Sequence, residues 1–304
     1  MNEPVRHETP AAESLLVDPL PRAAQLRRIG VRAARDAGVP LKSAFRSQMR
    51  VDTKSSAHDL VTVWDQRTED TLVEALTAAV PDSRITGEEG GSQGQGRLEW
   101  IIDPIDGTSN FAHGFAMFSI SIAAALDDEV IAAVVHDPVN ELTFSADDDA
   151  WLAAADAQER RLAPTPKTHV SEDRLNLVTS YPSAEVLAAS EAQALGSFAE
   201  LVRTYSTVRR VVSGALELCH AAAGWADVAA GTGTHPWDVG AGQLILRRAG
   251  GRYLPFGTRH GRSWDGSEEA PGRHLAPDYV GLGPGVAAPT IGHTIAAHAA
   301  RTRS

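Results

Sequence analysis

The chain has 304 residues, a length that suggests about two domains or one large one. Lys and Arg number 28 and Asp and Glu number 39, so the net charge is −11. This excess of negative charge argues against a protein that binds the phosphate backbone of nucleic acid. Hydrophobic residues make up 43% and charged residues 22% of the chain, as is typical of a folded globular protein rather than a disordered one.

Neither a membrane segment nor a disulfide is expected. Uncharged apolar stretches such as 120–126 are much shorter than the roughly 20 residues of a membrane-spanning helix. The first ten residues also lack the apolar core of a signal peptide. Cys219 is the single cysteine and lies in an apolar run, which favours a buried, unreactive thiol. We therefore expect a cytoplasmic protein without a membrane partner.

The first half of the chain predicts helices followed by a run of strands. Residues 1–18 are polar and without periodicity, which predicts a flexible tail. Apolar spacing and turn residues then predict the following elements. Helices are expected at 21–44 and from Asp65 to about 80, and strands at 83–86, 98–102, 118–125, 130–136 and 142–146, with a glycine-rich connector at 90–96.

The second half alternates helix and strand, which indicates layers of an α/β fold. The polar segment 156–174 predicts the boundary between two subdomains, 19–160 and 161–304. A strand is expected at 175–180 and helices at 184–201, 213–223 (with Ser213 as N-cap) and 235–249. The run 281–285 lacks the Lys-Ser/Thr of a nucleotide-binding loop, so it is interpreted as a terminal strand and turn.

Two aspartates, Asp103 and Asp106, follow directly after an apolar strand sequence. Pro104 favours an extended conformation for the residue before it, so both carboxylates are predicted where the strand ends. Gly107 and Thr108 start a new segment whose free N–H groups can bind phosphate. Carboxylates beside a phosphate would repel it unless a cation lay between them, and hard oxygen ligands favour Mg2+. A solvated turn or a helix cap is the alternative interpretation.

Further acidic residues can likewise be interpreted either as part of a metal site or as ordinary surface and capping residues. Glu88 and Glu89 follow another short strand and could supply one carboxylate to the same cation and one to its surroundings, or form a charged surface. Asp238 stands in the first turn of a predicted helix, where the helix dipole favours a carboxylate and a nearby anion. Helix capping alone would also explain Asp238.

Together these segments resemble the inositol monophosphatase family of Mg2+-dependent, lithium-sensitive sugar phosphatases, over about residues 22–285. Separate motifs in matching order and spacing carry the resemblance. They are Lys54-Ser55-Ser56, Asp59–Thr62 with Asp65, Gly87-Glu88-Glu89, Trp100–Thr108 with Asn110-Phe111, and Trp237-Asp238-Val239 with Gly240-Ala241-Gly242. The resemblance implies an α/β layered sandwich of alternating helix and sheet layers, and a homodimer.

The resemblance also implies a metal site with two or three Mg2+ ions. Glu88, Asp103 and the carbonyl of Ile105 would bind the first ion, and Asp103, Asp106 and Asp238 would bind the second. Metal-assisted attack of water on phosphorus would follow without a covalent enzyme intermediate.

The catalytic residues implied in this way are Asp65, Thr108 and Glu88. The hydroxyl of Thr108 and the carboxylate of Asp65 would orient the attacking water, and the N–H groups of Gly107 and Thr108 would hold the phosphate. The substrate would therefore be a phosphate ester bound between the metal ions and the start of this segment.

Five more residues are expected around this site. Lys54 and Asp59 would act near a mobile metal position, and Glu89 would lie in the outer sphere, with a surface charge as the alternative for each. His235 stands beside the site and could touch substrate. Inositol-specific members have an acidic residue seven positions before the aspartate of the Trp-Asp motif, and this chain has Gly231 there. That difference leaves phosphatase chemistry unaffected and puts the inositol substrate in doubt.

The function predicted from the sequence is hydrolysis of a small phosphorylated metabolite by a Mg2+-dependent phosphomonoesterase. Inositol 1-phosphate, histidinol phosphate, fructose 1,6-bisphosphate and a phosphoadenosine nucleotide remain alternative substrates. A non-catalytic regulatory or binding relative is the alternative of a different class. Loss of a metal carboxylate or of Thr108 would have favoured that alternative, and neither is lost.

Overall fold

The computed structural model describes residues 21–47, 51–53, 60–155 and 157–302, with the backbone alone at 51–53, 60 and 61. The expected tail at 1–18 and the candidate residues Lys54 and Asp59 lie outside the described residues. Within the described ranges, no helix combines the length and apolarity needed to cross a membrane. Cys219 is buried, as expected.

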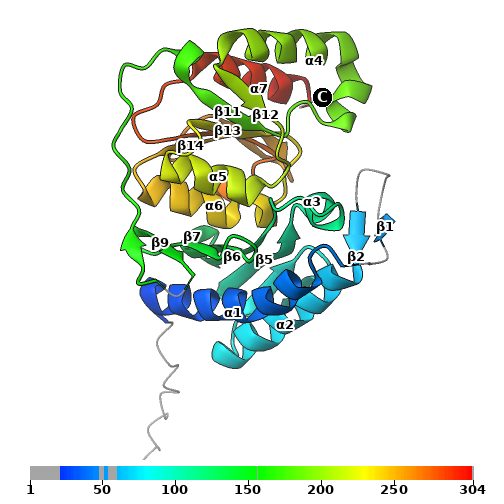
Figure 1. The fold of residues 1–304 in the computed structure, drawn as a ribbon, viewed down its shortest axis with the longest axis vertical. Helices are drawn as coiled ribbons and strands as arrows, with labels where there is room; N and C mark the ends of the chain where they lie inside the picture. The colour runs from blue at the N-terminus through cyan, green and yellow to red at the C-terminus, as the bar shows by residue number, and fades with distance from the viewer. Residues whose placement is uncertain (1–20, 48–50, 54–59, 156, 303–304) are drawn as a thin grey trace, which may run out of the picture.

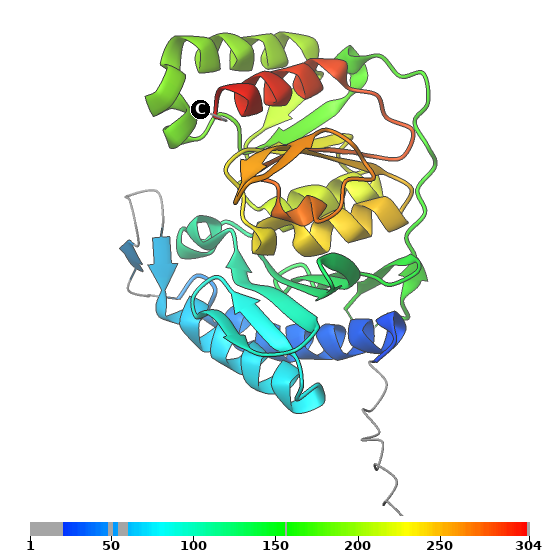
Figure 2. The same ribbon diagram turned by 180° about the vertical axis from the view of Figure 1, so that it is seen from behind.

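Layers of helix and sheet alternate along the long axis of the molecule, from a helix pair through a sheet, a second helix pair and a second sheet to a third helix pair (Figure 1). The view from behind shows the same succession (Figure 2). The helix pairs are α1 (Ala23–Ala44) with α2 (Val63–Ala79), α5 (Gly214–Ala223) with α6 (Pro236–Arg248), and α4 (Ala184–Thr204) with α7 (Pro289–Arg301). The predicted α/β layered sandwich is therefore confirmed.

The first sheet has the strand order β10-β9-β8-β7-β6-β5-β3-β4. Its neighbours are antiparallel except for the parallel pair β3 and β5. Its strands are β3 (Arg84–Gly87), β4 (Gly91–Gly94), β5 (Leu98–Asp106), β6 (Ser119–Leu126), β7 (Glu129–Asp137), β8 (Leu142–Ala146), β9 (Ala150–Ala154) and β10 (Arg160–Arg161). The short α3 (Thr108–Ala112) follows β5, and β1 (Val51–Thr53) pairs antiparallel with β2 (Leu60–Thr62) in a separate two-stranded sheet.

The second sheet has the order β12-β11-β13-β16-β14-β15, with parallel pairing among the first three strands and antiparallel pairing elsewhere. Its strands are β11 (Asn176–Thr179), β12 (Thr207–Arg209), β13 (Val228–Gly231), β14 (Arg252–Arg259), β15 (Arg262–Asp265) and β16 (Asp278–Leu282). Two short 3-10 helices span Glu172–Arg174 and Arg273–Leu275. The division into subdomains near residue 160 stays a prediction.

Both sheets pack against α5 and α6, and this shared core fixes the position of the site. Buried residues of β6, β7, α5, α6, β14 and β16 form one continuous apolar cluster. Small side chains such as Ala215, Ala221 and Ala241 are fully buried there, so helix and sheet backbones can approach closely. The N-termini of α5 and α6 consequently lie over the first sheet, near the end of β5.

Four expectations about elements differ from the structure. The glycine-rich segment forms the edge strand β4, whose exposed residues carry no apolar alternation that could be read. Strand β5 continues to Asp106 with a register shift after Asp103, because Pro104 cannot donate a ladder hydrogen bond. The elements that were not predicted are the strands β1, β2, β9, β10 and β12 to β15 and the helices α3 and α7. The terminal strand predicted at 281–285 is the end of β16 and the turn before α7.

Candidate active site

A cavity of about 250 Å³ lies where β5 ends and α3, α5 and α6 begin. These elements meet between the two sheets in the middle of the molecule (Figure 1). The cavity is lined by Glu88, Asp103, Ile105, Asp106, Gly107, Thr108, Ser109, Ser180, Val212, Gly214, Glu217, Thr232, Gly233, Thr234, Asp238 and Tyr279. The structure thus brings together seven of the residues singled out from the sequence, although they span about half of the chain.

The four carboxylates that were expected to bind metal all face this cavity. Asp103 is 2% and Asp106 5% exposed. Burial, followed by the charges of Glu88, Asp106 and Asp238, raises the pKa of Asp103 well above its usual range. Burial is also the largest cause that raises the pKa of Asp238 to about 8. Without a cation Asp103 and Asp238 favour the protonated form, because they are desolvated and lie near other carboxylates.

Asp238 caps its own helix α6, as the capping interpretation expected, whereas Asp106 caps α5, a helix far along the chain, and not the segment that follows it. Asp106 accepts hydrogen bonds from the N–H groups of Gly214 and Ala215 at 3.0 Å each and from the Ser213 hydroxyl at 2.5 Å. Ser213 is the N-cap of α5, as predicted, but its hydroxyl binds Asp106 rather than its own helix. Asp238 accepts from the N–H of His235 at 2.7 Å. Capping fixes both carboxylates at the cavity wall.

The chemistry of the cavity fits Mg2+, although the distances are not those of a closed site. Four carboxylate residues and Ile105 line it, and no basic residue is among the lining residues that the structure describes. Such hard, anionic oxygen donors favour a divalent cation. Among the described residues, no three His, Cys, Asp or Glu side chains stand close enough to hold an ion as they are. Mg2+ is usually held by one or two carboxylates together with water and phosphate oxygens, so the carboxylates that line the cavity fit this ion.

Thr108 and Asp65 are in direct contact. The Thr108 hydroxyl lies 2.9 Å from Asp65 Oδ1 and 3.0 Å from the Ile105 carbonyl oxygen. Asp65 is fully buried and accepts from the N–H and hydroxyl of Thr62, both at 2.7 Å, in the capping box of α2. Burial raises the pKa of Asp65 despite these hydrogen bonds. The contact gives the Thr108 hydroxyl a fixed direction; its role toward water stays a prediction.

The turn between β5 and α3 requires a glycine. Gly107 has φ of 92°, and a Cβ there would stand 3.0 Å from the Met117 carbonyl oxygen and 3.3 Å from that of Val212. With this glycine the chain reverses directly from the aspartates into α3. Gly107 and Thr108 therefore line the same cavity as the carboxylates, as the phosphate-binding prediction requires.

Two of the remaining candidates do not line the cavity. Glu89 lies in the loop after β3, where Glu69 accepts hydrogen bonds from the N–H groups of Glu89 at 2.9 Å and Gly90 at 2.6 Å. His235 stacks on Trp237, with ring centroids 4.7 Å apart. Glu69 was missed because its role, to fix the loop that carries Glu88, depends on a contact between distant segments.

Gly231 itself is not among the residues that line the cavity, although Thr232 and Tyr279 are, and its expected role toward substrate stays a prediction. It is buried in β13, and its φ is not in the left-handed region. A Cβ at Gly231 would stand 2.6 Å from Cε1 of Tyr279 and 3.2 Å from Cγ2 of Thr234. The ring of Tyr279 thus occupies the space beside this glycine, so a glutamate could not be introduced to bind substrate without displacing it.

We expect Gly231→Ala to lower the melting temperature, because the added methyl overlaps the Tyr279 ring. Overpacking of this kind costs about 1–3 kcal/mol. Gly292→Ala in α7 is the matched control, since a Cβ there meets nothing within 4 Å, and alanine in a helix is stabilising by roughly 0.5–1 kcal/mol. Thermal melts of the two variants should shift in opposite directions. A melting temperature of Gly231→Ala at or above that of the parent would contradict the close approach of Tyr279.

Several cavity residues had no signal of their own in the sequence: Ser180, Val212, Thr232, Thr234 and Tyr279. Glu217 did have a signal in the sequence, because it is the single acidic residue in the apolar run of α5. It is 1% exposed, and burial, followed by the charge of Asp106, raises its pKa to about 8. An acid in an apolar helix face is a signal of function that could have been used.

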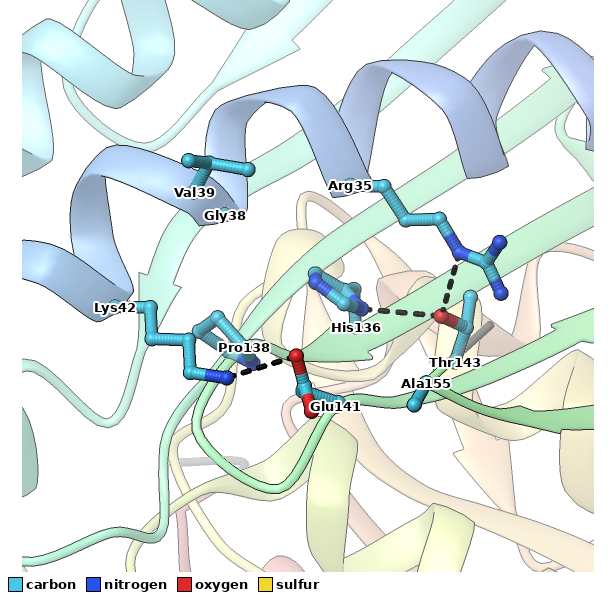
Figure 3. A pocket seen from close by; sticks show the side chains of 9 residues that line it. All are labelled: Arg35, Gly38, Val39, Lys42, His136, Pro138, Glu141, Thr143 and Ala155. Carbon is cyan, nitrogen blue, oxygen red and sulfur yellow. Dashed lines mark hydrogen bonds and ion pairs between the residues drawn. The ribbon is translucent and has the colours of Figure 1, made fainter. Parts of the chain in front are cut away.

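A second cavity, of about 180 Å³, lies between α1 and the turn from β7 to β8 (Figure 3). Its charged groups are engaged with the protein: Lys42 pairs with Glu141 at 2.8 Å, and Arg35 Nε donates to Thr143 at 3.1 Å. Burial lowers the pKa of His136 to about 4, so its ring is neutral at physiological pH. This cavity offers no cluster of carboxylates and is not the candidate site.

The metal-free protein is expected to lose stability as the pH rises. Asp238 has a folded-state pKa of about 8 against an ordinary 3.8, so between these values the folded state holds more protons than the unfolded state. The contribution of Asp238 to stability is complete below pH 3.8 and is lost as the pH rises past about 8. Because Mg2+ would replace those protons, its stabilising effect in thermal melts should be larger near pH 8 than near pH 5. An equal effect at both pH values would contradict metal binding by these carboxylates.

Comparisons with known proteins agree with this arrangement. A model of the inositol monophosphatase family matches residues 22–297. The chain is 35% identical to the Nus factor SuhB of Xylella fastidiosa, covering 75% of this chain and 81% of that one. It is 32% identical to the inositol-1-monophosphatase of Bacillus subtilis, covering 75% and 84%. The structure of the Thermotoga maritima IMPase superposes with a TM-score of 0.72 at 24% identity, over 91% and 98% of the two chains. The chain therefore belongs to the inositol monophosphatase family.

Proposed function

We propose that this protein is a Mg2+-dependent phosphomonoesterase that hydrolyses a small phosphorylated metabolite. One observation carries the proposal: four carboxylates, of which those of Asp103 and Asp106 are buried, line one cavity together with the start of α3 and Thr108, whose hydroxyl contacts Asp65. Carboxylates alone would suit any divalent cation site. Their combination with a positioned hydroxyl and the free N–H groups of a helix start is the arrangement that phosphate ester hydrolysis requires.

The ligands proposed for the cations are Glu88, Asp103, the Ile105 carbonyl, Asp106 and Asp238. Asp103 would be shared between two ions, since the charges of the other three carboxylates all act on it. When bound, the metal lowers the pKa of water and offsets negative charge on the phosphate and the leaving oxygen. The helix caps hold Asp106 and Asp238 in place for this role.

The protein's own residues position the reacting groups. The N–H groups of Gly107 and Thr108 would hold phosphate oxygens, and the Thr108 hydroxyl, directed by Asp65, would orient water in line with the ester bond. The water oxygen attacks phosphorus while the bond to the ester oxygen breaks. One proton of the water passes through the Thr108 hydroxyl to Asp65, which is suited as the base by its raised pKa. The leaving alkoxide takes up a proton from solvent, so the alcohol and inorganic phosphate are the products.

The test is phosphate release from a panel of phosphomonoesters, measured with Mg2+ and with a chelator. The panel contains inositol 1-phosphate, histidinol phosphate, fructose 1,6-bisphosphate and a 3′-phosphoadenosine nucleotide. We expect Mg2+-dependent release from at least one of them. A folded protein that binds Mg2+ but releases phosphate from none would refute the proposal and favour a non-catalytic member of the family.

That second candidate has support in the names of relatives, because several similar proteins are named Nus factor SuhB and not phosphatase. The complete set of carboxylates and the Thr108–Asp65 contact favour catalysis. The absence of a nucleic-acid partner rests on the net charge of −11 and stays a prediction.

The proposal also includes the finer properties of the family resemblance. We expect inhibition by lithium, a homodimer in solution, a cytoplasmic location, and two subdomains that meet near residue 160. Sizing by light scattering and phosphate release with added lithium chloride test the first two of these directly.

A further inference from the structure

Val212 has a backbone conformation that is rare for its residue type. Its φ is 60°, in the left-handed region where the Cβ of an ordinary L-residue is crowded and a β-branched residue is an outlier. Among the described residues other than glycine that have positive φ, Val212 alone is β-branched. Such a conformation persists where the surrounding structure fixes it, and it is concentrated at functional sites.

Hydrogen bonds on both sides fix this part of the chain. The N–H of Val212 donates to Oε1 of the buried Glu217 at 3.0 Å. The carbonyl of the preceding Val211 accepts from Nδ2 of Asn110 at 2.7 Å, and Asn110 also donates to the carbonyl of Met117 at 2.7 Å. The loop before α5 is thereby tied to α3 on one side and to α5 on the other. The valine cannot relax without breaking these bonds.

The side chain held in this way lies at the wall of the candidate active site. Val212 lines the cavity and is 47% exposed. Many of its neighbours in the cavity wall are hydroxyl-bearing or acidic, among them Ser180, Thr232 and Glu217. Val212 is therefore an exposed apolar residue beside hydroxyl-bearing and acidic ones, on the loop that follows β12.

We propose that Val212 determines substrate specificity by packing against the carbon skeleton of the alcohol portion of the substrate. The inference rests on the proposed phosphatase function. Glu217 and Thr232 line the same cavity, and the buried atoms Oε2 of Glu217 and Oγ1 of Thr232 have no hydrogen-bond partner among the described residues. The substrate class that suits both features is a phosphate monoester whose alcohol has one apolar face and a hydroxyl or amino group elsewhere.

The test compares two esters that differ only in ring hydroxyls, inositol 1-phosphate and cyclohexyl phosphate. Val212→Thr keeps the volume and the β-branching and replaces one methyl by a hydroxyl. The measured quantity is kcat/KM for cyclohexyl phosphate divided by kcat/KM for inositol 1-phosphate. We expect this ratio to be roughly 10-fold lower in Val212→Thr than in the parent, which is the lower range of the effect of one apolar group in a pocket. Because the ratio is compared between variants, the different reactivity of the two leaving groups cancels.

Val202 supplies the matched controls, since it is 54% exposed and lies on α4. Val202→Thr should leave the ratio unchanged. Val212→Gly should move the ratio in the same direction as Val212→Thr and keep the melting temperature at or above that of the parent, because glycine accepts positive φ. Val202→Gly should lower the melting temperature, because it places glycine in a helix.

The outcomes separate this inference from the proposed function. If the parent protein hydrolyses phosphomonoesters and the ratio in Val212→Thr stays within about 2-fold of the parent ratio, Val212 does not determine specificity and the inference alone fails. If the parent hydrolyses no ester of either panel, the proposed function fails and the inference fails with it.

Discussion

Replacing Asp103 by asparagine is expected to lower Mg2+-dependent phosphate release about 100-fold, the upper range for substitutions at a metal site. The amide keeps the shape of the side chain and its ability to accept from the Ile105 N–H, now at 3.0 Å. It removes a charge that would act on both ions. Since Asp103 is buried among three other carboxylates whose charges raise its pKa, the metal-free variant should melt no lower than the parent.

Phosphate release over a range of Mg2+ concentrations, with thermal melts in a chelator, checks both parts of this expectation. Asp82→Asn is the control, because Asp82 is exposed in the turn after α2. Near-normal turnover of Asp103→Asn at saturating Mg2+ would show that Asp103 is not a shared ligand. A large fall in melting temperature would show instead that Asp103 mainly stabilises the fold.

Replacing Thr108 by valine should lower turnover about 100-fold, at the low end of the effect of a positioned proton-transfer group. Valine has the same shape but cannot form the 2.9 Å contact with Asp65 Oδ1. The Mg2+ concentration for half-maximal activity should change little, since the expected effect is on the transition state and not on metal binding. Thr108→Ser keeps the hydroxyl and should retain most of the turnover.

The measurement is kcat, together with a Mg2+ titration, for both Thr108 variants. Equal losses of turnover and of Mg2+ affinity in Thr108→Val would assign the hydroxyl to the metal site. A valine variant as active as the serine variant would remove Thr108 from the catalytic role and leave its contact with Asp65 as a structural one.

The order of elements could be predicted where local patterns were strong. The apolar face of α2, the β6–β8 strands and the N-terminal proline of α6 each gave a signal within a few residues. The strand β4 could not be predicted, because an exposed edge strand of glycine and polar residues has no apolar period. The sequence contained a signal for the helix α7, Pro289 followed by Ile291 and Ile295. This signal was not used, because the residues before it were interpreted as a terminal strand.

The residues of the candidate site likewise fall into those that the sequence indicated and those that only the structure showed. By itself the sequence determined the fold class and the carboxylate set, because motifs such as Asp103–Thr108 carry their chemistry within a few residues. Only the tertiary structure decided that Tyr279 fills the space beside Gly231, that Glu69 fixes the Glu88 loop, and that Val212 is held at the cavity wall. Each of these depends on a contact between segments far apart in the chain. Such contacts are set by how the layers pack, which no local pattern of residues encodes.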